Sequence, residues 1–570
     1  MRFFWSKPRR VSSAHAGHEI APDEIFLDSS NLPEFDTYQF EGRLERAISK
    51  KTLAIASAFF FVFCTLLLVR TWILQVKQGE TYSLLSERNS LHHTVIFAPR
   101  GLIEDRNGVS LVSNNASDTH PEYPSRVYTA GPGFAHLLGY VEYPKKDSSG
   151  VYYRYEFKGK EGVEVFYDDL LVGENGAKIT EQNVSGKVES ESLLKPSRAG
   201  VTLTLSIDSR MQSAWYGFIK DVATTNNFTG GAGVLLDIET GEIIAMTSFP
   251  EFNSTVLSEG EDTLAIKGYV SNKAEPFLNR AVNGLYTPGS IVKPFLATGA
   301  LTEKLIDPNK KILSTGSISI PNPFDPKKKS VFMDWRAHGW VDMRQALAVS
   351  SDVYFYEIGG GYGDQQGLGI YNIEKYLRLF GFGQANEDNF LLSTAGTLPN
   401  PEWKSKNFDG EIWRVGDTYN SAIGQYGMQV TPLQAVRGIA AVANDGKLLE
   451  PTVLKDGNQG RAYAKDLGLS SDDLAVVREG MRDAVRSGGT AQNINISGVQ
   501  IAAKTGTAEL DSKKQFVNSW IVGFFPYDKP RYAFAMIMEK GPHENTVGAL
   551  YVMRRFFEWL VVSAPEYVKE

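Results

Sequence analysis

The stretch from Tyr286 to Phe295 reads YTPGSIVKPF and places Ser290 and Lys293 three residues apart, directly after a Pro-Gly turn. Positions i and i+3 share one face of a helix, so a hydroxyl and an amine can meet there. Pro294 suits a first helical turn and disfavours a deeper position, which predicts that Ser290 opens a helix. Serine is a weak nucleophile unless a neighbour takes its proton, and a lysine amine that is neutral for part of the time can do so.

Spacing alone does not identify a catalytic pair, because Ser192 and Lys195 repeat it in SLLK without the turn. A second motif is Ser350-Ser351-Asp352, which by itself is typical of an ordinary helix cap. These two motifs therefore need support from the rest of the chain.

A third motif, KTGT, runs from Lys504 to Thr507 on a predicted strand. Gly506 would weaken the strand unless something approaches its backbone closely, and a substrate lying along the strand is one such reason. Lys504 supplies positive charge, and the hydroxyls of Thr505 and Thr507 can bind a carboxylate. The three motifs follow one another in the order Ser290, Ser350, Lys504.

The composition excludes several classes of function. A net charge of −7 and a pI of about 5.8 argue against a nucleic-acid partner, which would require a basic surface. The single cysteine, Cys64, allows neither an intramolecular disulfide nor a cysteine-based zinc site. No HExxH spacing is present, so we expect neither a metal nor a cofactor.

Residues 52–69 form an uncharged apolar run of 18 residues, long enough at 1.5 Å per residue to cross the apolar part of a bilayer. About 50 residues precede it, so an uncleaved anchor is favoured over a signal peptide. The slight excess of basic residues before the run predicts a cytoplasmic N-terminus, with the remaining chain outside. These flanking residues are Arg43, Arg46, Lys50 and Lys51 before the run and Arg70, Lys77 and Arg88 after it.

The remaining sequence predicts an α+β protein. Residues 91–205 are rich in short alternating stretches and turns, which is typical of a β-rich module. Two strands are predicted within 231–249, helical spacing extends from about 278 to 445, and three apolar strands follow at 499–509, 519–526 and 531–540. A final amphipathic helix is predicted at about 547–562. Strands at both ends of a domain, with helices between them, indicate an antiparallel sheet covered by helices.

The motifs, taken in their order, resemble those of the class B penicillin-binding proteins, and in particular the elongation-type subfamily of penicillin-binding protein 2. Asp352 favours that subfamily, because division-type members carry Asn at this position. The resemblance is also carried by the stretches APRGLIEDRNG (98–108), GKEGVEVFYDDLLVGENG (159–176), LLDIETGEIIAMTSFPEFN (235–253), GDTYNSAIGQYGMQVTPLQ (416–434) and KTGTAE (504–509).

The resemblance implies an antiparallel five-stranded sheet with helices on both faces, an all-helical subdomain, an elongated β-rich pedestal and one transmembrane helix. The implied domains are a disordered cytoplasmic tail (1–51), the transmembrane helix (52–74), a pedestal of the dimerisation type (75–208) and a transpeptidase domain (209–570). The stretch between Arg100 and Gly159 is short for this subfamily, which leaves contacts of the pedestal head with partners undecided.

The resemblance also implies a peptidoglycan D,D-transpeptidase of cell elongation and shape maintenance, inhibited by β-lactams. Ser290 would attack the carbonyl of the penultimate D-Ala, and Lys293 would act as its base. Ser350 would relay a proton to the leaving amine, held in place by Lys504, while Asp352 orients Lys293 or the acyl chain. The oxyanion hole would consist of the backbone N–H groups of Ser290 and Thr507, and the terminal carboxylate would lie on Thr505, Gly506 and Thr507.

The implied partners are D-Ala-D-Ala stem peptides, β-lactams, a SEDS-type glycan polymerase and other proteins of the elongation complex. Two alternatives remain open. One is a hydrolase, either a D,D-carboxypeptidase or a β-lactamase, although no Glu-x-x-Leu-Asn stretch is found that could position a deacylating water. The other is a non-catalytic β-lactam sensor or scaffold, although the cytoplasmic tail is short for a signalling domain.

Overall fold

The computed structural model describes residues 49–83, 91–116, 121–148, 150–182, 188–325, 327–385, 393–455, 464–511 and 513–569. Residues 1–90 form one compact unit and residues 91–570 form the other. Because the second unit is continuous from the pedestal to the C-terminus, the boundary at 208/209 remains a prediction. The tail for which disorder is predicted lies almost wholly outside the described residues.

The N-terminal unit contains the predicted apolar helix, α1 (Lys50–Trp72), which continues as a short π-helix, η4 (Ile73–Lys77). Ser49 caps α1, because its hydroxyl accepts a hydrogen bond from the Thr52 backbone. The helical segment has 28 residues and a mean hydropathy of 2.5 in its most apolar window, and none of that window is buried. Its length and composition are sufficient to cross a membrane.

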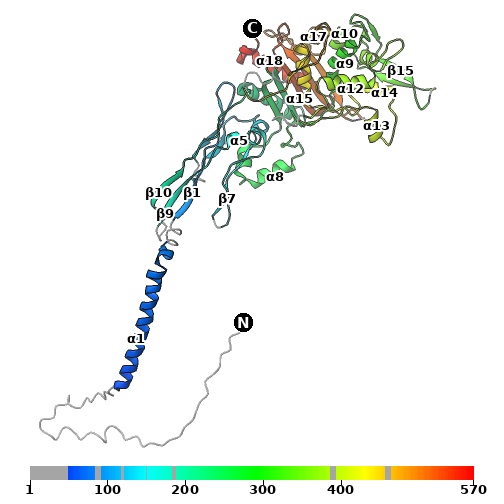
Figure 1. Ribbon diagram of the computed structural model, residues 1–570. Coiled ribbons are helices and arrows are strands. Elements are labelled where there is room, and N and C mark those ends of the chain that lie inside the picture. Colours follow the sequence, from blue (N-terminus) through cyan, green and yellow to red (C-terminus); the bar gives the residue numbers. More distant parts are fainter. Residues whose placement is uncertain are drawn as a thin grey trace, which may run out of the picture. The chain divides into compact units, whose positions relative to one another are not determined.

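The pedestal is built from small sheets, as the alternating sequence predicts (Figure 1). One sheet has the order β1-β9-β10 and another the order β11-β2-β3-β4, and two further strand pairs, β5-β8 and β6-β7, accompany them. The strands are β1 (Leu91–Ile96), β2 (Ile103–Glu104), β3 (Ser110–Asn115), β4 (Ser125–Tyr128), β5 (Val141–Glu142), β6 (Lys145–Lys146), β7 (Tyr152–Arg154), β8 (Lys158–Gly159), β9 (Gly176–Gln182), β10 (Val188–Lys195) and β11 (Leu203–Thr204). Three short helices accompany them: α3 (Ala135–Leu138), α4 (Gly162–Phe166) and α5 (Asp168–Leu171).

A buried ion cluster joins the two pedestal stretches that carry the family resemblance. The Glu164 carboxylate receives Arg100 Nε at 2.6 Å and Arg126 Nε at 2.7 Å, and all three side chains are fully buried. Arg100 also pairs with Asp168 at 2.6 Å. A buried carboxylate between two guanidinium groups links segments that are 64 residues apart, so it fixes the packing of α4 on the start of the pedestal.

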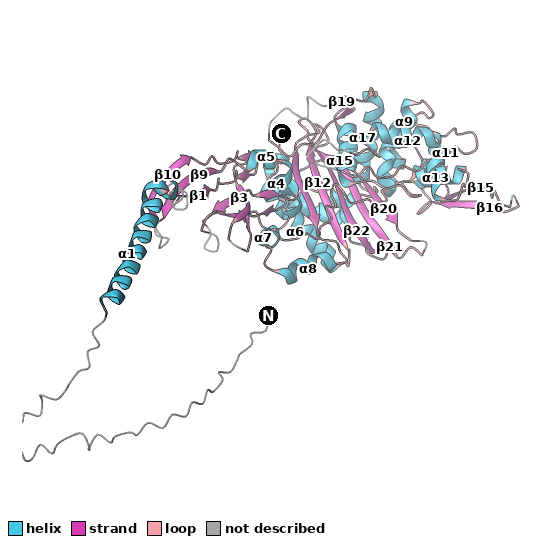
Figure 2. Ribbon diagram, turned by 60° about the horizontal axis from the view of Figure 1, so that its bottom comes forward, coloured by secondary structure: helices cyan, strands magenta, loops and turns pink. Residues whose placement is uncertain are grey.

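Within the second unit, the largest sheet is five-stranded and antiparallel, with the order β13-β12-β22-β21-β20 (Figure 2). Its strands are β12 (Gly230–Asp237), β13 (Ile243–Phe249), β20 (Ala502–Glu509), β21 (Phe516–Phe525) and β22 (Tyr532–Pro542). The hairpin of β12 and β13 therefore pairs, through β12, with β22, a strand about 300 residues later in the chain. β20, which carries the KTGT motif, forms one edge of the sheet.

Helices cover both faces of this sheet. Trp215 of α6 packs with Phe556 of α18 and with Leu235 on one face, while Val234 points to the other face and joins the core of α15. Local signals explain where these helices begin: Asp208 caps α6, and Thr431 forms a capping box just before Pro432 at the start of α15. The helices are α6 (Ser209–Thr225), α15 (Pro432–Ala443), α17 (Ser471–Val485) and α18 (Ala549–Ser563), with η6 (Gln492–Ile494) and η7 (Pro565–Tyr567) nearby.

The segment between β13 and α15 contains most of the remaining helices. They are α7 (Ser254–Glu259), α8 (Thr263–Ser271), η5 (Gly289–Val292), α9 (Lys293–Thr302), α10 (Met343–Val349), α11 (Asp352–Gly360), α12 (Gly369–Leu379), α13 (Pro401–Asn407) and α14 (Val415–Ala422). The prediction of helical spacing from about 278 to 445 is wrong for residues 312–341. Short strands occupy that part: β14 (Ile312–Ser314), β15 (Ser317–Pro321), β16 (Lys329–Met333) and β17 (Gly339–Val341), while β18 (Lys447–Leu448) and β19 (Lys465–Asp466) pair after α15.

Candidate active site

Ser290 lies in a single 3₁₀ turn, η5, that leads into α9, and it is half-buried at the wall of a cleft of about 1000 Å³. The predicted helix start is thus correct to within one turn: α9 begins at Lys293, and Pro294 occupies its first turn. The hydroxyl of Ser290 makes no hydrogen bond to any described residue, which leaves it free toward the cleft.

Lys293 is fully buried, and its amine is held by three oxygens of the second motif. Nζ donates to the Ser350 carbonyl at 2.9 Å, to Ser350 Oγ at 3.2 Å and to Asp352 Oδ1 at 2.6 Å. The same Nζ lies 5.3 Å from the centre of the Phe355 ring. Lys293 therefore joins η5, the turn that contains Ser290 (the nucleophile turn), to the start of α11.

Ser350 lies between the two lysines. Its Oγ accepts from Lys504 Nζ at 2.8 Å in addition to the bond from Lys293, although the two lysines are far apart in sequence. Ser350 adopts a left-handed backbone conformation with φ of 59°, which is uncommon for a residue other than glycine and is found disproportionately at functional sites. This conformation separates α10 from α11 and points the hydroxyl at both amines.

Lys504 is completely buried on the edge strand β20. Burial lowers the pKa of its ammonium well below the ordinary value, and the nearby charge of Lys293 lowers it further. Asp352 acts in the opposite direction without reversing the shift. The Lys504 amine can therefore give up its proton more readily than an exposed lysine does, which is the property that a proton relay needs.

The third motif presents two hydroxyls to the cleft. Thr505 is half-buried and its Oγ1 lies 2.8 Å from Thr490 Oγ1, while Thr507 is exposed. Both residues line the same cleft as Ser290 and Ser350. Because successive side chains of a strand point to opposite faces, Thr505 and Thr507, two residues apart, face the same side of β20.

The structure gives a different reason for glycine at position 506 from the one expected from sequence. A Cβ atom there would lie 2.8 Å from Ile291 Cγ2 and 2.9 Å from the Pro288 carbonyl oxygen. The backbone that approaches the strand is therefore the nucleophile turn itself. This packing brings η5 against β20 and explains why only glycine fits.

The structure brings together every residue that the sequence analysis placed in the site, and it adds residues that sequence reasoning missed. Gly424 approaches Gly289 so closely that a Cβ would meet the Gly289 carbonyl oxygen at 2.1 Å, which gives the GQYG stretch a packing role. Asp334 had no recognisable signal, yet its buried carboxylate accepts from Ser351 Oγ at 2.9 Å and from the Val353 backbone at 3.0 Å.

Asp334 is held as an anion at the start of α11. Burial alone would raise the pKa of this carboxyl, but the hydrogen bonds from the backbone of Val353 and Asp352 and from the Ser351 hydroxyl outweigh that effect and lower it. The positive charge of Lys293 acts in the same direction. A fixed anion beside a helix N-terminus stabilises the turn that contains Ser350.

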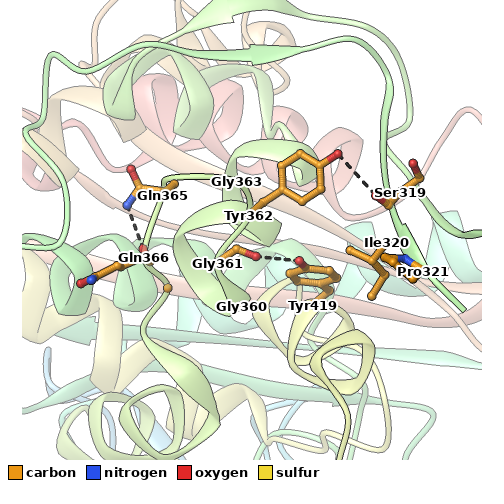
Figure 3. Close-up of a pocket in the computed structure, with 11 residues that line it drawn as sticks. Ser319, Ile320, Pro321, Gly360, Gly361, Tyr362, Gly363, Gln365, Gln366 and Tyr419 are labelled. Carbon is orange, nitrogen blue, oxygen red and sulfur yellow. Dashed lines mark hydrogen bonds between the residues drawn. The ribbon is translucent and has the colours of Figure 1, made fainter. Parts of the chain in front are cut away.

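A second pocket, of about 630 Å³, lies at the end of α11 and contains none of the predicted site residues (Figure 3). The glycine-rich residues 360–363 line it, and Tyr419, which also lines it, donates a hydrogen bond to the Gly361 carbonyl at 2.6 Å. No group of three or more potential metal ligands exists among the described residues of the chain.

Comparison with known proteins identifies the class. Residues 231–554, more than half of the chain, match the penicillin binding protein transpeptidase domain, and residues 119–205 match the penicillin-binding protein dimerisation domain. The chain therefore belongs to the penicillin-binding protein transpeptidase family.

Individual relatives narrow the class. The peptidoglycan D,D-transpeptidase MrdA of Acinetobacter baumannii is 32% identical over 456 residues, which cover 75% of this chain and 65% of the relative. Penicillin-binding protein 2 of Pseudomonas aeruginosa, solved in complex with WCK 5153, has 29% identity and a TM-score of 0.69, covering 84% of this chain and 98% of that one. The Helicobacter pylori protein, solved in complex with MreC, has 25% identity and a TM-score of 0.67, covering 83% and 99%. Within its family the chain is of the class B, penicillin-binding protein 2 type, as the resemblance implied.

The matching region spans about two thirds of the length of the curated relatives, at 65% and 66% for two of them.

Proposed function

We propose that this protein is a peptidoglycan D,D-transpeptidase that crosslinks stem peptides through an acyl-enzyme on Ser290 during cell elongation. The observation that supports this most strongly is the hydrogen-bonded chain from Lys293 through Ser350 to Lys504, whose middle member, Ser350, lines one cleft together with Ser290. A hydroxyl between two buried amines is suited to moving protons, and Ser290 is free to attack.

In the acylation step, Ser290 Oγ attacks the carbonyl carbon of the penultimate D-Ala while Lys293 accepts its proton. The peptide C–N bond then breaks, and the leaving D-Ala nitrogen receives a proton through Ser350, which exchanges protons with Lys293 and Lys504. The close packing of η5 on β20 supports an oxyanion hole made of the Ser290 and Thr507 backbone N–H groups, a contribution often worth about 3 kcal/mol.

The substrate carboxylate would lie on the hydroxyls of Thr505 and Thr507. β20 is an edge strand whose free side borders the cleft, so a peptide can add to the sheet there and align its terminal D-Ala with these hydroxyls. Gly506 permits the turn of Ser290 to approach that edge. β-Lactams would enter the same position and leave a long-lived ester on Ser290.

The crosslinking reaction itself tests this function. The full chain would be incubated with peptidoglycan that carries pentapeptide stems, and muropeptides would be analysed by mass spectrometry. We expect crosslinked dimers with release of D-Ala, and their loss in Ser290→Ala. Tetrapeptide monomers without dimers would instead indicate a carboxypeptidase, and the absence of D-Ala release would indicate a scaffold or sensor.

The apolar segment from Lys50 to Lys77 supports a single-pass anchor in the cytoplasmic membrane. We propose that the catalytic unit lies outside and the tail in the cytoplasm, which rests on the slight excess of basic residues before the segment. We also propose the predicted domain limits: a cytoplasmic tail (1–51), a transmembrane helix (52–74), a pedestal (75–208) and a transpeptidase domain (209–570).

Partners follow from the same family type. We propose that the pedestal and the anchor bind a SEDS-type glycan polymerase and other elongation proteins; that the Helicobacter pylori relative was solved in complex with MreC supports a protein partner. Co-purification of the full chain with such a polymerase, and stimulation of polymerisation, would be measured; absence of both would refute this part.

A further inference from the structure

Five consecutive residues, from Val331 to Trp335, line the cleft that contains Ser290. They comprise the end of β16 and the two residues that follow it, and β16 pairs only with β15 among the described strands. The cleft therefore has a second strand wall besides the edge strand β20.

This wall exposes an unusual amount of apolar surface. Val331, Met333 and Trp335 are 54%, 65% and 55% exposed, respectively. Val331 and Met333 are two residues apart on β16, so their side chains project to the same side of the strand, and Trp335, which follows the strand, lines the same cleft. These three side chains form the apolar row. Three adjacent large apolar side chains that remain exposed inside a reaction cleft indicate a surface that is covered by a ligand.

Hydrogen bonds attach the strand wall to the turn that contains Ser350. Trp335 Nε1 donates to the carbonyl of Val349, the residue before Ser350, at 3.3 Å, and Tyr356 donates its hydroxyl to the Met333 carbonyl at 3.0 Å. Between them, Asp334 accepts the hydrogen bonds from Ser351 and Val353. The apolar row is thus held in a fixed position beside Ser350, on elements other than β20.

We propose that Val331, Met333 and Trp335 bind the acceptor stem peptide, the second peptidoglycan peptide that brings the attacking amine; this inference rests on the proposed transpeptidase function. The donor peptide occupies the edge of β20, so the acceptor needs another wall that continues to Ser290. A row of Val, Met and Trp fits the methyl groups of the stem's alanines and the aliphatic part of the side chain that carries the amine, and contact there displaces water, the competing nucleophile.

The acceptor step is a simple acyl transfer. The acceptor ammonium first loses one proton to solvent, and its nitrogen then bonds to the acyl carbon on Ser290. The ester C–O bond breaks, and the second proton moves from nitrogen to Ser290 Oγ through Ser350. The products are a new amide and the free serine, and no oxidant or further reactant is needed. If water attacks instead, the product is a free acid.

The ratio of amide to acid measures the acceptor wall directly, because both products arise from one acyl-enzyme. The full chain in detergent would be given a D-alanyl thioester donor and a stem tetrapeptide with a free side-chain amine, and products would be quantified by mass spectrometry. We expect Trp335→Ala to lower the amide-to-acid ratio about tenfold, as the loss of one aromatic contact implies. Met333→Ser provides a second variant with a smaller expected decrease.

Trp340→Ala is the matched control, because Trp340 is 63% exposed on β17 and does not line the cleft. A decrease in both cleft variants, with the wild-type ratio kept in Trp340→Ala, supports the inference. An unchanged ratio in Trp335→Ala and Met333→Ser overturns it, as does an equal decrease in the control. If the wild-type chain forms neither product, the proposed function itself fails, which is a different result from an unaltered ratio.

Discussion

At the scale of single residues, the site depends on Ser350 receiving hydrogen bonds from two buried lysines. Its left-handed conformation is held by neighbours: the Lys293 amine donates to its carbonyl, and the Asp334 carboxylate accepts from the Ser351 hydroxyl and the Val353 backbone. Charge is balanced in the same small volume, since Lys293 faces Asp352 directly and Asp334 lies nearby. A change at any of these positions should therefore affect proton movement more than folding.

Lys293→Met should lower the rate constant for acylation by a fluorescent penicillin by about 10²-fold or more, because general-base help is lost. The amine is also an anchor for Ser350, so the effect should not be recovered by higher penicillin concentrations. Lys195→Met is the control: it belongs to the second Ser-x-x-Lys, on β10, where Lys195 is exposed and pairs with Glu174. Equal rates for wild type and Lys293→Met would contradict the assignment.

The buried Lys504 predicts a pH dependence of stability. Its pKa is lower in the folded protein than the ordinary 10.5, so between those two values the unfolded chain holds more protons. Stability should therefore rise with pH through that window, by at most about 1.4 kcal/mol per pH unit from this group. Thermal unfolding of wild type and Lys504→Met between pH 7 and 10 would be compared, and the variant should lack this rise. Parallel curves would exclude the effect.

At the scale of elements, several patterns predicted the structure well. Short apolar runs bounded by turns predicted β12, β13 and the three C-terminal strands, because a buried strand needs little beyond an apolar run and a turn. The short strands at 312–341 were missed, because two-stranded hairpins of three to five residues are too short to give a clear period. Asp334 was missed for a related reason: one carboxylate acquires its role only when the hairpin folds onto α11.

The pedestal ion cluster gives a prediction about stability. Glu164→Gln removes the carboxylate that Arg100 and Arg126 share; Arg100 keeps Asp168 as a partner, whereas the fully buried Arg126 loses its carboxylate partner. Leaving buried charges without their partner typically costs about 3 to 5 kcal/mol, so the free energy of unfolding of the pedestal should fall by that order. Chemical denaturation would measure it, with Glu174→Gln, at an exposed ion pair, as the control. A loss below 1 kcal/mol, or one equal to the control's, would be inconsistent with a structural role for the cluster.

At the scale of the whole molecule, the chain combines an apolar helix with a continuous unit from Leu91 onward. The proposed topology predicts that a phosphatase reporter, active only outside the cytoplasm, works when fused to the C-terminus and is inactive when fused to the N-terminus. The reverse pattern would refute the orientation. The sequence predicts this orientation only weakly, because the numbers of basic residues before and after the helix differ little.

The nucleophile is the claim on which the proposed function depends most. Labelling the full chain with a fluorescent penicillin, digesting it and mapping the modified peptide by mass spectrometry tests it directly. A stable adduct on Ser290, absent in Ser290→Ala, is the predicted result. An adduct on any other residue, or none in a folded protein, would contradict it.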